Sequence, residues 1–320
     1  MNLSTSNITI LLTAYGPPGP LSYGIFFIVF VLYLTTIFSN LTLMLVIIFD
    51  SALHKPMYIF LFNLAINGLI GSSTVFPTIL QYLLQDVKSI SLTSCLLQTF
   101  FINVYGTCAY AILTVMAYDR YVCICKPLQY HNIMTPVKVR LLLGVAYFFP
   151  ICSLAVQVYL TARLPLCKHT VNKLFCISLA VVNLACVKPL LDSLYFLFLL
   201  FVFGFLPLFL VILSYIKILT VSIKASKTAQ TKALKTCAPH LITFINFSSA
   251  SLSSVIYNSF YDHLSDEVSI FMSVHFILIP PLLHPLIYGI RTQEIRKCIS
   301  RILRKNVPLN SVGSAETKHR

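Results

Sequence analysis

Seven stretches of this chain are long enough and apolar enough to cross a lipid bilayer, and this feature constrains the fold more than any other. A membrane helix needs about 20 mostly apolar residues to span a hydrocarbon core about 30 Å thick. Backbone groups in lipid must find their hydrogen-bond partners within the segment, so we expect helices and not open strands. The expected spans cover residues 23–49, 56–83, 94–124, 139–160, 190–221, 234–260 and 268–290.

These spans predict an all-α membrane protein whose core is a seven-transmembrane helix bundle. The bundle covers residues 23–290, an N-terminal segment covers 1–22, and a short amphipathic helix with a tail covers 291–320. Charged residues make up 10% of the chain, whereas they make up about 25% of soluble domains, so a soluble binding module is excluded. No cleavable signal peptide is apparent, and we expect the first span to act as the targeting signal.

Lysine and arginine are distributed unevenly between the two sides of the predicted bundle. They concentrate in the first, third and fifth connections and after the last span. Because cytoplasmic loops are enriched in these residues, we expect a multi-pass plasma-membrane protein with an extracellular N-terminus and a cytoplasmic C-terminus. The net charge of +14 then reflects topology and contact with membrane lipid, not binding to nucleic acid. The N-terminal segment also carries glycosylation acceptor patterns at Asn2 and Asn7.

Four of the ten cysteines fall on the predicted outer side, namely Cys95, Cys167, Cys176 and Cys186. An oxidising exterior favours disulfides, and four cysteines allow three pairings, which the residues alone leave open. On the inner side, Cys298 lies in a basic amphipathic stretch just after the seventh span. It is a candidate for palmitoylation, and an unmodified thiol facing the membrane is an equal alternative.

The segment 116–130, MAYDRYVCICKPLQY, ends the third span with an acid and a base, Asp119 and Arg120. Charges at this depth are costly unless they are paired or face a cavity. Taken alone, the two residues fit an anchor that stops the helix at the interface. Together with the surrounding Tyr, Cys, Pro and Leu residues, the segment resembles the third-helix signature of odorant receptors, a branch of the rhodopsin-like G-protein-coupled receptors.

Other segments repeat this resemblance along almost the whole chain, including LHKPMY at 53–58, KALKTC at 232–237 and PLLHPLIY at 281–288. The resemblance implies that Arg120, once freed from Asp119, reaches a G protein. The implied coupling residues are Asp119, Arg120, Tyr121, Tyr215, Pro285 and Tyr288, with Tyr215 and Tyr288 moving toward Arg120 in the active state. It also implies the disulfides Cys95–Cys176 and Cys167–Cys186.

Three positions depart from what related receptors have. Gly68 stands where many rhodopsin-like receptors have an acid, Ala109 replaces a Glu usual in odorant receptors, and His284 replaces the Asn before Pro285. A hard cation needs oxygen ligands and charge compensation, so we expect no mid-bundle sodium site, and we expect no other metal and no cofactor. We expect His284 to be neutral and hydrogen-bonded, with titration near neutral pH as the alternative.

The outer half of the bundle, between the third, fifth, sixth and seventh helices, is the expected ligand site. Its expected lining residues are Ile102, Asn103, Gly106, Thr107, Ser248, Ser251, Leu252 and Val255. The serines of 248–254 have an ordinary alternative, which is hydrogen bonding to carbonyls of their own helix. No charged residue falls on the deep faces of these helices, so we expect a small neutral or weakly polar odorant, provided that charges near the mouth do not fold inward.

The resemblance implies an odorant receptor that activates a stimulatory heterotrimeric G protein and raises cyclic AMP. A transporter or channel would usually show internal repeats or ionisable residues at mid-membrane, and apart from His284 the spans show neither. A membrane enzyme would need a nucleophile with a base or a cluster of metal ligands, and we find neither within the spans, so we expect no enzyme. A non-sensory receptor of the same fold, expressed outside olfactory tissue, is the alternative that the residues leave open.

Overall fold

The computed structural model describes residues 8–14, 18–187, 190–260 and 266–306. Its longer helices are α1 (Pro20–Phe49), α2 (Pro56–Leu84), α3 (Leu92–Cys125), α5 (Pro136–Ala162), α7 (Leu190–Leu200), α8 (Leu206–Ile223), α9 (Lys227–Phe260), α10 (Asp266–Arg291) and α11 (Gln293–Asn306). Short helical turns are η2 (Ser51–Leu53), η3 (Pro127–Gln129), α4 (Tyr130–Ile133) and α6 (Ser178–Val182). The predicted glycosylation acceptors Asn2 and Asn7 lie outside the described residues.

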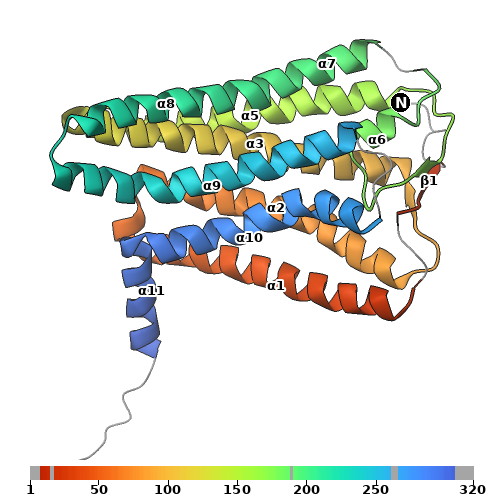
Figure 1. Ribbon diagram of the computed structural model, residues 1–320, viewed down its shortest axis with the longest axis horizontal. Helices are drawn as coiled ribbons and strands as arrows, with labels where there is room; N and C mark the ends of the chain where they lie inside the picture. Colours follow the sequence, from red (N-terminus) through yellow and green to blue (C-terminus); the bar gives the residue numbers. More distant parts are fainter. Residues whose placement is uncertain (1–7, 15–17, 188–189, 261–265, 307–320) are drawn as a thin grey trace, which may run out of the picture.

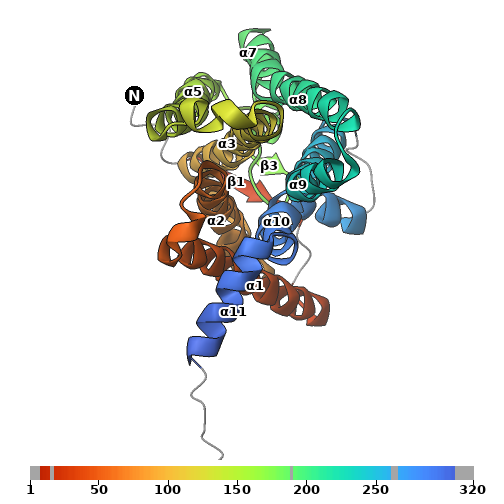
Figure 2. The same ribbon diagram turned by 90° about the vertical axis from the view of Figure 1, so that its left-hand side faces the viewer.

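The long helices lie side by side in a bundle, and α11 turns away from it at one end (Figure 1). Helices α7 and α8 form one fifth span through the π-helical turn η4 (Phe201–Phe205). Pro207 follows this turn in the first turn of α8. A proline lacks the amide hydrogen that an α-helix requires, which accounts for the altered hydrogen bonding just before it. Helix α3 contacts α2, α5, α8 and α9, so it is the central helix of the bundle (Figure 2).

The helical bundle confirms the predicted fold class. Within the described residues, six helical segments are long and apolar enough to cross a membrane, and they match six predicted spans to within a few residues at each end. Helix α9, the predicted sixth span, is not among these six, although it lies in the bundle beside α10 and α3. Polar residues explain its lower hydropathy, since His240, Asn246 and the serines of 248–254 all lie in this helix.

A side chain of α1 satisfies a carbonyl that a proline frees in α10. Pro285 has no amide hydrogen, so the carbonyl of Pro281, one turn earlier, loses its helical donor. Asn40 Nδ2 donates to this oxygen at 2.9 Å. Pro281 also fills the space beside Gly68 of α2, because a Cβ at position 68 would lie 3.2 Å from Pro281 Cβ. Pro281 therefore fills the space that a larger side chain, such as the acid of related receptors, would need at this position of the second helix.

A second freed carbonyl in α10 is satisfied from α3. Pro280 removes the helical donor of the Phe276 carbonyl, and Tyr105 Oη donates to this oxygen at 3.3 Å. The Tyr105 ring lies directly against Gly71 of α2, where a Cβ would approach Tyr105 Cγ to 2.5 Å. Glycine at position 71 is thus needed for the close approach of α2 and α3.

A small sheet covers one end of the bundle, which we call the strand end. The strand β1 (Thr9–Leu12) lies between β2 (Ser89–Ser91), to which it is antiparallel, and β3 (Thr170–Val171), to which it is parallel. Ile10 and Leu12 of β1 point inward and are buried. None of these strands was expected from the sequence, because their pairing joins segments far apart in the chain.

Two disulfides hold the loop that leads from α5 to α7 at the strand end. Cys176 is bonded to Cys95 at the start of α3, and Cys167 is bonded to Cys186 within the loop. These are the pairings that the resemblance implies. Cys95 and Cys176 are fully buried, and Gln98 Oε1 accepts a hydrogen bond from the Cys176 amide at 2.9 Å. The loop segment after β3 is therefore fixed over the bundle.

At the opposite end, α11 packs its apolar side on the bundle. Ile295 and Cys298 are buried, and Arg301 Nη1 lies 3.3 Å from Asp50 Oδ2. The Cys298 thiol lies next to the Asp50 carboxylate. With 3% of its surface exposed, Cys298 faces the bundle and not the membrane. The structure thus contradicts a membrane-facing thiol and presents no accessible sulfur for palmitoylation.

Candidate functional site

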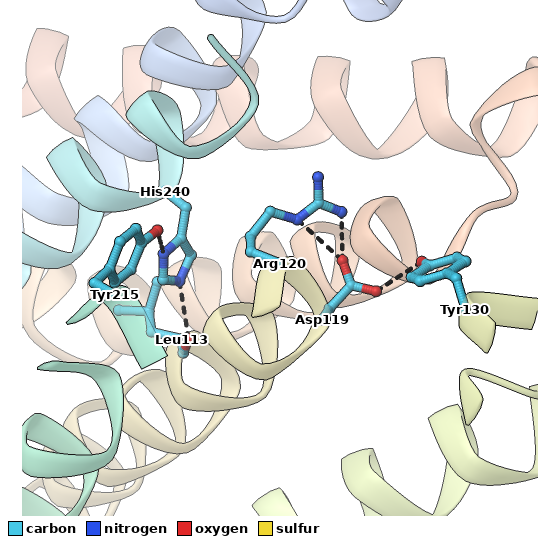
Figure 3. Close-up of polar contacts among 6 residues, drawn as sticks. All are labelled: Leu113, Asp119, Arg120, Tyr130, Tyr215 and His240. Carbon is cyan, nitrogen blue, oxygen red and sulfur yellow. Dashed lines mark hydrogen bonds and ion pairs between the residues drawn. The ribbon is translucent and has the colours of Figure 1, made fainter. Parts of the chain in front are cut away.

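A buried ion pair lies near the α11 end of α3. Arg120 Nε donates to Asp119 Oδ2 at 3.0 Å, and Nη2 bonds the same oxygen. Tyr130 Oη donates to Asp119 Oδ1 at 2.7 Å, so both carboxylate oxygens are used (Figure 3). Burial and the nearby Asp119 charge raise the pKa of Tyr130 above its usual 10.0, which keeps its hydroxyl protonated as a donor. Asp119 is fully buried and Arg120 is 9% exposed, so pairing is what makes these charges tolerable here.

A second chain of hydrogen bonds lies beside the ion pair and joins three helices. Tyr215 Oη of α8 lies 2.7 Å from His240 Nδ1 of α9, and His240 Nε2 lies 2.9 Å from the Leu113 carbonyl of α3 (Figure 3). Both ring nitrogens of this buried histidine are therefore used. The site residues expected from the sequence include neither His240 nor Tyr130. The available signal was a histidine within a predicted membrane span.

Of the other expected coupling residues, Tyr215 and Tyr288 lie near Arg120 without bonding to it. Tyr215 and Tyr288 lie within electrostatic range of Arg120. Tyr288 is 1% exposed, and its hydroxyl makes no hydrogen bond of standard geometry to a described residue, although Thr243 lies next to it. Pro285 is buried one turn before Tyr288, and Tyr121 is half-buried. In this arrangement Asp119 holds Arg120.

A cavity of about 200 Å³ lies toward the strand end, between the helices and the loop before α7. Helices α3, α5, α7, α9 and α10 contribute to its wall, and Lys173, Leu174 and Phe175 cover it from the loop. Six of the eight expected pocket residues line it, namely Ile102, Asn103, Gly106, Thr107, Ser251 and Val255. It is smaller than a drug-sized pocket, so it suits a small ligand.

Two expected pocket residues do not line this cavity. Leu252 is 58% exposed on the outside of α9, and Ser248 is not part of the wall. One residue along a helix rotates the side chain by about 100°, so the neighbour of Ser251 faces lipid instead. Ser249 and Ser253 bond the carbonyls of Asn246 and Ala250, both at 3.0 Å, which is the ordinary alternative for this serine run.

Several polar wall residues lie outside the expected set, among them Lys173 and Gln157. Lys173 is a charge near the mouth that does reach the cavity, where its Nζ lies 4.4 Å from the centre of the Tyr257 ring. Gln157 of α5 lines the cavity with 8% of its surface exposed. In the sequence, Gln157 could have been recognised as a lone amide side chain within an apolar span. The position of Lys173 depends on the disulfides and the sheet, which no local pattern reveals.

A row of aromatic rings connects the cavity with the hydrogen-bonded chain. Tyr110 lines the cavity, and its ring centre lies 6.4 Å from that of Phe244. Phe244 stacks on His240 at 6.4 Å, and His240 stacks on Tyr215 at 5.8 Å. The rings touch in sequence, so a displacement at Tyr110 has a packed route to Tyr215.

His284 is 3% exposed, and its ring centre lies 6.2 Å from that of Phe247. Its Nε2 makes no hydrogen bond to a described residue. The hydrogen bond expected of this histidine is therefore not formed at Nε2.

Comparison with known proteins decides the family. The family profile described as "Olfactory receptor" matches residues 29–306. Olfactory receptor 1E16 of Mus musculus is 33% identical over 298 residues, which cover 92% of this chain and 94% of that protein. Olfactory receptor 51G1 of Homo sapiens is 33% identical over 312 residues, which cover 95% of each chain. The chain belongs to the olfactory receptor family.

As an olfactory receptor, the chain is a G-protein-coupled receptor and not an enzyme. Members of this family are multi-pass plasma-membrane proteins that respond to small-molecule odorants and couple to G proteins. The fold of this olfactory receptor therefore has seven membrane helices, with α9 as the sixth despite its polar residues.

Proposed function

We propose that this olfactory receptor binds a small, neutral or weakly polar odorant in the cavity beneath the strand end and activates a stimulatory G protein, which raises cyclic AMP. The observation that carries the proposal is the row of rings from Tyr110, in the cavity wall, to Tyr215, beside Arg120. This row of rings connects a bound ligand, through side chains in contact, with the end of the bundle that holds Arg120.

The ligand class follows from the lining. The cavity wall is mostly apolar, and its polar groups are hydroxyls and amides apart from Lys173. The Lys173 ammonium is stabilised by the face of Tyr257. A buried amine ligand would find no carboxylate among the described wall residues. A neutral ligand avoids the cost of desolvating a charge.

The coupling step is proposed to be a rearrangement around Arg120. At rest, Asp119 and Tyr130 hold Arg120, and His240 ties α8 and α9 to α3. A ligand that displaces Tyr110 shifts Phe244 and His240, which weakens the bond to Tyr215. Tyr215 and Tyr288 then turn toward Arg120, which leaves Asp119 and contacts the G protein. A ligand shifts this equilibrium only as far as it binds the two states differently.

Two further assignments belong to this proposal. The strand end, with residues 1–22, faces outward, and α11 with the tail, residues 291–320, lies in the cytoplasm, as the distribution of Lys and Arg favours. Asn2 and Asn7 would then be accessible for glycosylation. Lipid-facing helix surfaces carry exposed apolar side chains such as Phe38 and Phe198.

The proposal is tested by expressing the chain with a stimulatory G protein and screening neutral odorants, acids and amines for cyclic AMP. We expect neutral odorants to be the active class and Arg120→Ala to abolish the response at equal surface expression. Arg140→Ala, at an exposed position of α5, is the matched control. Activity that survives Arg120→Ala, selective activation by an amine, or ionic current without G protein would each contradict part of the proposal.

A further inference from the structure

The Gln157 amide lies in the cavity wall, and no described residue forms a hydrogen bond with its nitrogen or oxygen. The residue as a whole is 8% exposed. An amide at a cavity wall that has no protein partner must pair with water or with a ligand to avoid the cost of an unmade hydrogen bond. Such a group is retained where something other than the protein can pair with it.

Gln157 also stands where two cavities meet. The first is the odorant cavity described above, and the second, about 240 Å³, lies between α5, α6 and α7. Gln157, Ser178, Leu179 and Phe196 line both. The amide therefore faces a junction with mostly apolar space on either side, large enough to take a short hydrocarbon chain.

Several other polar groups at the two cavities are already engaged, whereas the Asp192 carboxylate lines the second cavity. Asn103 Nδ2 donates to Ser178 Oγ at 2.7 Å, and Thr107 Oγ1 donates to the Asn103 carbonyl at 2.8 Å. Lys173 is engaged with the Tyr257 ring. Thr161, which lines the second cavity, donates its hydroxyl to the Gln157 backbone carbonyl at 3.0 Å. The Gln157 amide thus offers both a free donor and a free acceptor at the junction.

We propose that Gln157 is the residue that selects the odorant's polar group, and that the preferred ligands are neutral molecules with one hydroxyl or carbonyl oxygen on an aliphatic chain. An amide pairs with either oxygen group, because it both donates and accepts. The aliphatic chain of the ligand then lies in the apolar space beside the junction. This inference rests on the proposed function, since it names the ligand class of the same cavity.

The test separates binding from signalling. The purified full chain is heated with octane, octanol, octanal, octanoic acid or octylamine, because a ligand that binds the folded state raises the unfolding temperature. The variants are Gln157→Met, which keeps the length of the side chain without its amide, and the control Thr35→Val, which removes a hydroxyl of α1 that lines neither cavity. Lys173→Gln tests the other polar group at the cavity.

We expect octanol and octanal to raise the unfolding temperature of the wild type and of Thr35→Val more than octane does. In Gln157→Met this advantage is lost, and in cells the potency of both compounds falls about tenfold, as loss of one buried hydrogen bond predicts. Without ligand, Gln157→Met unfolds at or above the wild-type temperature, because it loses an unpaired amide. A structural role for the amide would give a lower temperature and would overturn the inference.

Four further results would overturn it: equal stabilisation by octane and octanol, a preference for the oxygen compounds that survives in Gln157→Met, stabilisation by octanoic acid alone that Lys173→Gln removes, or no stabilisation by any compound. Failure of the proposed function looks different. In that case octanol and octanal stabilise the receptor through Gln157, but no cyclic AMP response follows.

Discussion

Asn40 and Pro281 lie on the first and seventh membrane helices, and a hydrogen bond of 2.9 Å joins the amide of one to the carbonyl of the other. The carbonyl is available because Pro285 cannot donate to it. In lipid such an oxygen finds no water, so a side chain from a neighbouring helix must satisfy it. This bond explains how α10 tolerates a proline in its interior and why α1 stays beside it.

Replacing Asn40 with leucine should destabilise the bundle by about 1–3 kcal/mol, because the Pro281 carbonyl is then buried without a donor. The unfolding temperature of the purified receptor measures this loss. Asn63→Leu is the matched control, since Asn63 Nδ2 donates to the Ile59 carbonyl of its own helix. Equal effects of the two substitutions would mean that the bond to Pro281 has no special weight.

Adding one methyl group at position 71 should be costly, whereas the same change at position 144 should not. A Cβ at Gly71 would lie 2.5 Å from Tyr105 Cγ. A Cβ at Gly144 would have no neighbouring atom within 4 Å. We expect Gly71→Ala to lose about 1–3 kcal/mol through overpacking and Gly144→Ala to be neutral or slightly stabilising. Surface expression and unfolding temperature report both, and a tolerant Gly71→Ala would show that the Tyr105 ring can move aside.

The helices could be predicted well from the sequence, and the strand end could not. The length of each apolar stretch predicted a span because a segment that crosses the hydrocarbon core must be apolar and must form a helix of that length. Helix α9 begins at Lys227 and not at position 234, because a helix continues past the bilayer where hydropathy no longer marks it. The pairing of Ile10 with Ile90 joins residues 80 positions apart, and nothing local to either strand reveals it.

Replacing His240 with phenylalanine should raise signalling in the absence of odorant. The ring volume and stacking stay, but the bonds to Tyr215 and to the Leu113 carbonyl are lost, so α8 and α9 are held less firmly to α3. A hydrogen bond contributes about 0.5–1.5 kcal/mol net, which corresponds to an increase of about two- to tenfold in the active population. Basal cyclic AMP at equal surface expression measures it, with lipid-facing Ile245→Leu as control. Unchanged basal activity would exclude the hydrogen bonds of His240 as a restraint on the active state.

The two disulfides should differ in what they contribute. Cys95–Cys176 closes a loop with a sequence separation of 81, and Cys167–Cys186 one of 19. In the chain-entropy description the larger loop stabilises by about 1 kcal/mol more. We expect Cys176→Ser to abolish surface expression and Cys186→Ser to reduce it. The reverse order would indicate that local strain, not loop closure, decides the outcome.

Thiol labelling should separate Cys298 from an accessible cysteine. Burial, together with the hydrogen bond to Asp50 and its charge, raises the pKa of the Cys298 thiol to about 11. The reactive thiolate is therefore scarce at neutral pH, and its amount rises about tenfold per pH unit toward that pKa. Maleimide labelling of Cys298, followed by mass spectrometry, should be slow at neutral pH and faster in Asp50→Ala. Rapid labelling at neutral pH, or an acyl group on Cys298 from cells, would contradict the buried position.

For the candidate site, prediction worked where helical position decides the answer. Asn103 and Thr107 on α3, and Ser251 and Val255 on α9, are pairs spaced by four residues on one helix face, so they reach the cavity together. The prediction for Leu252 was wrong because a small error in the assumed rotation of α9 turns a side chain from the cavity to the lipid. Lys173 reaches the cavity through a loop whose course the disulfides determine, and helix periodicity carries no information about it.

The strand β1 gives residues 9–13 a part in the shape of the cavity beneath the strand end. Thr13 N donates to the Val171 carbonyl at 2.9 Å, two residues before Lys173. A chimaera that exchanges this N-terminal stretch between two receptors without its β3 partner would change the register above the cavity. The stretch and the loop thus form one structural unit, and a change in the strand can alter the roof of the cavity without any change in its helical walls.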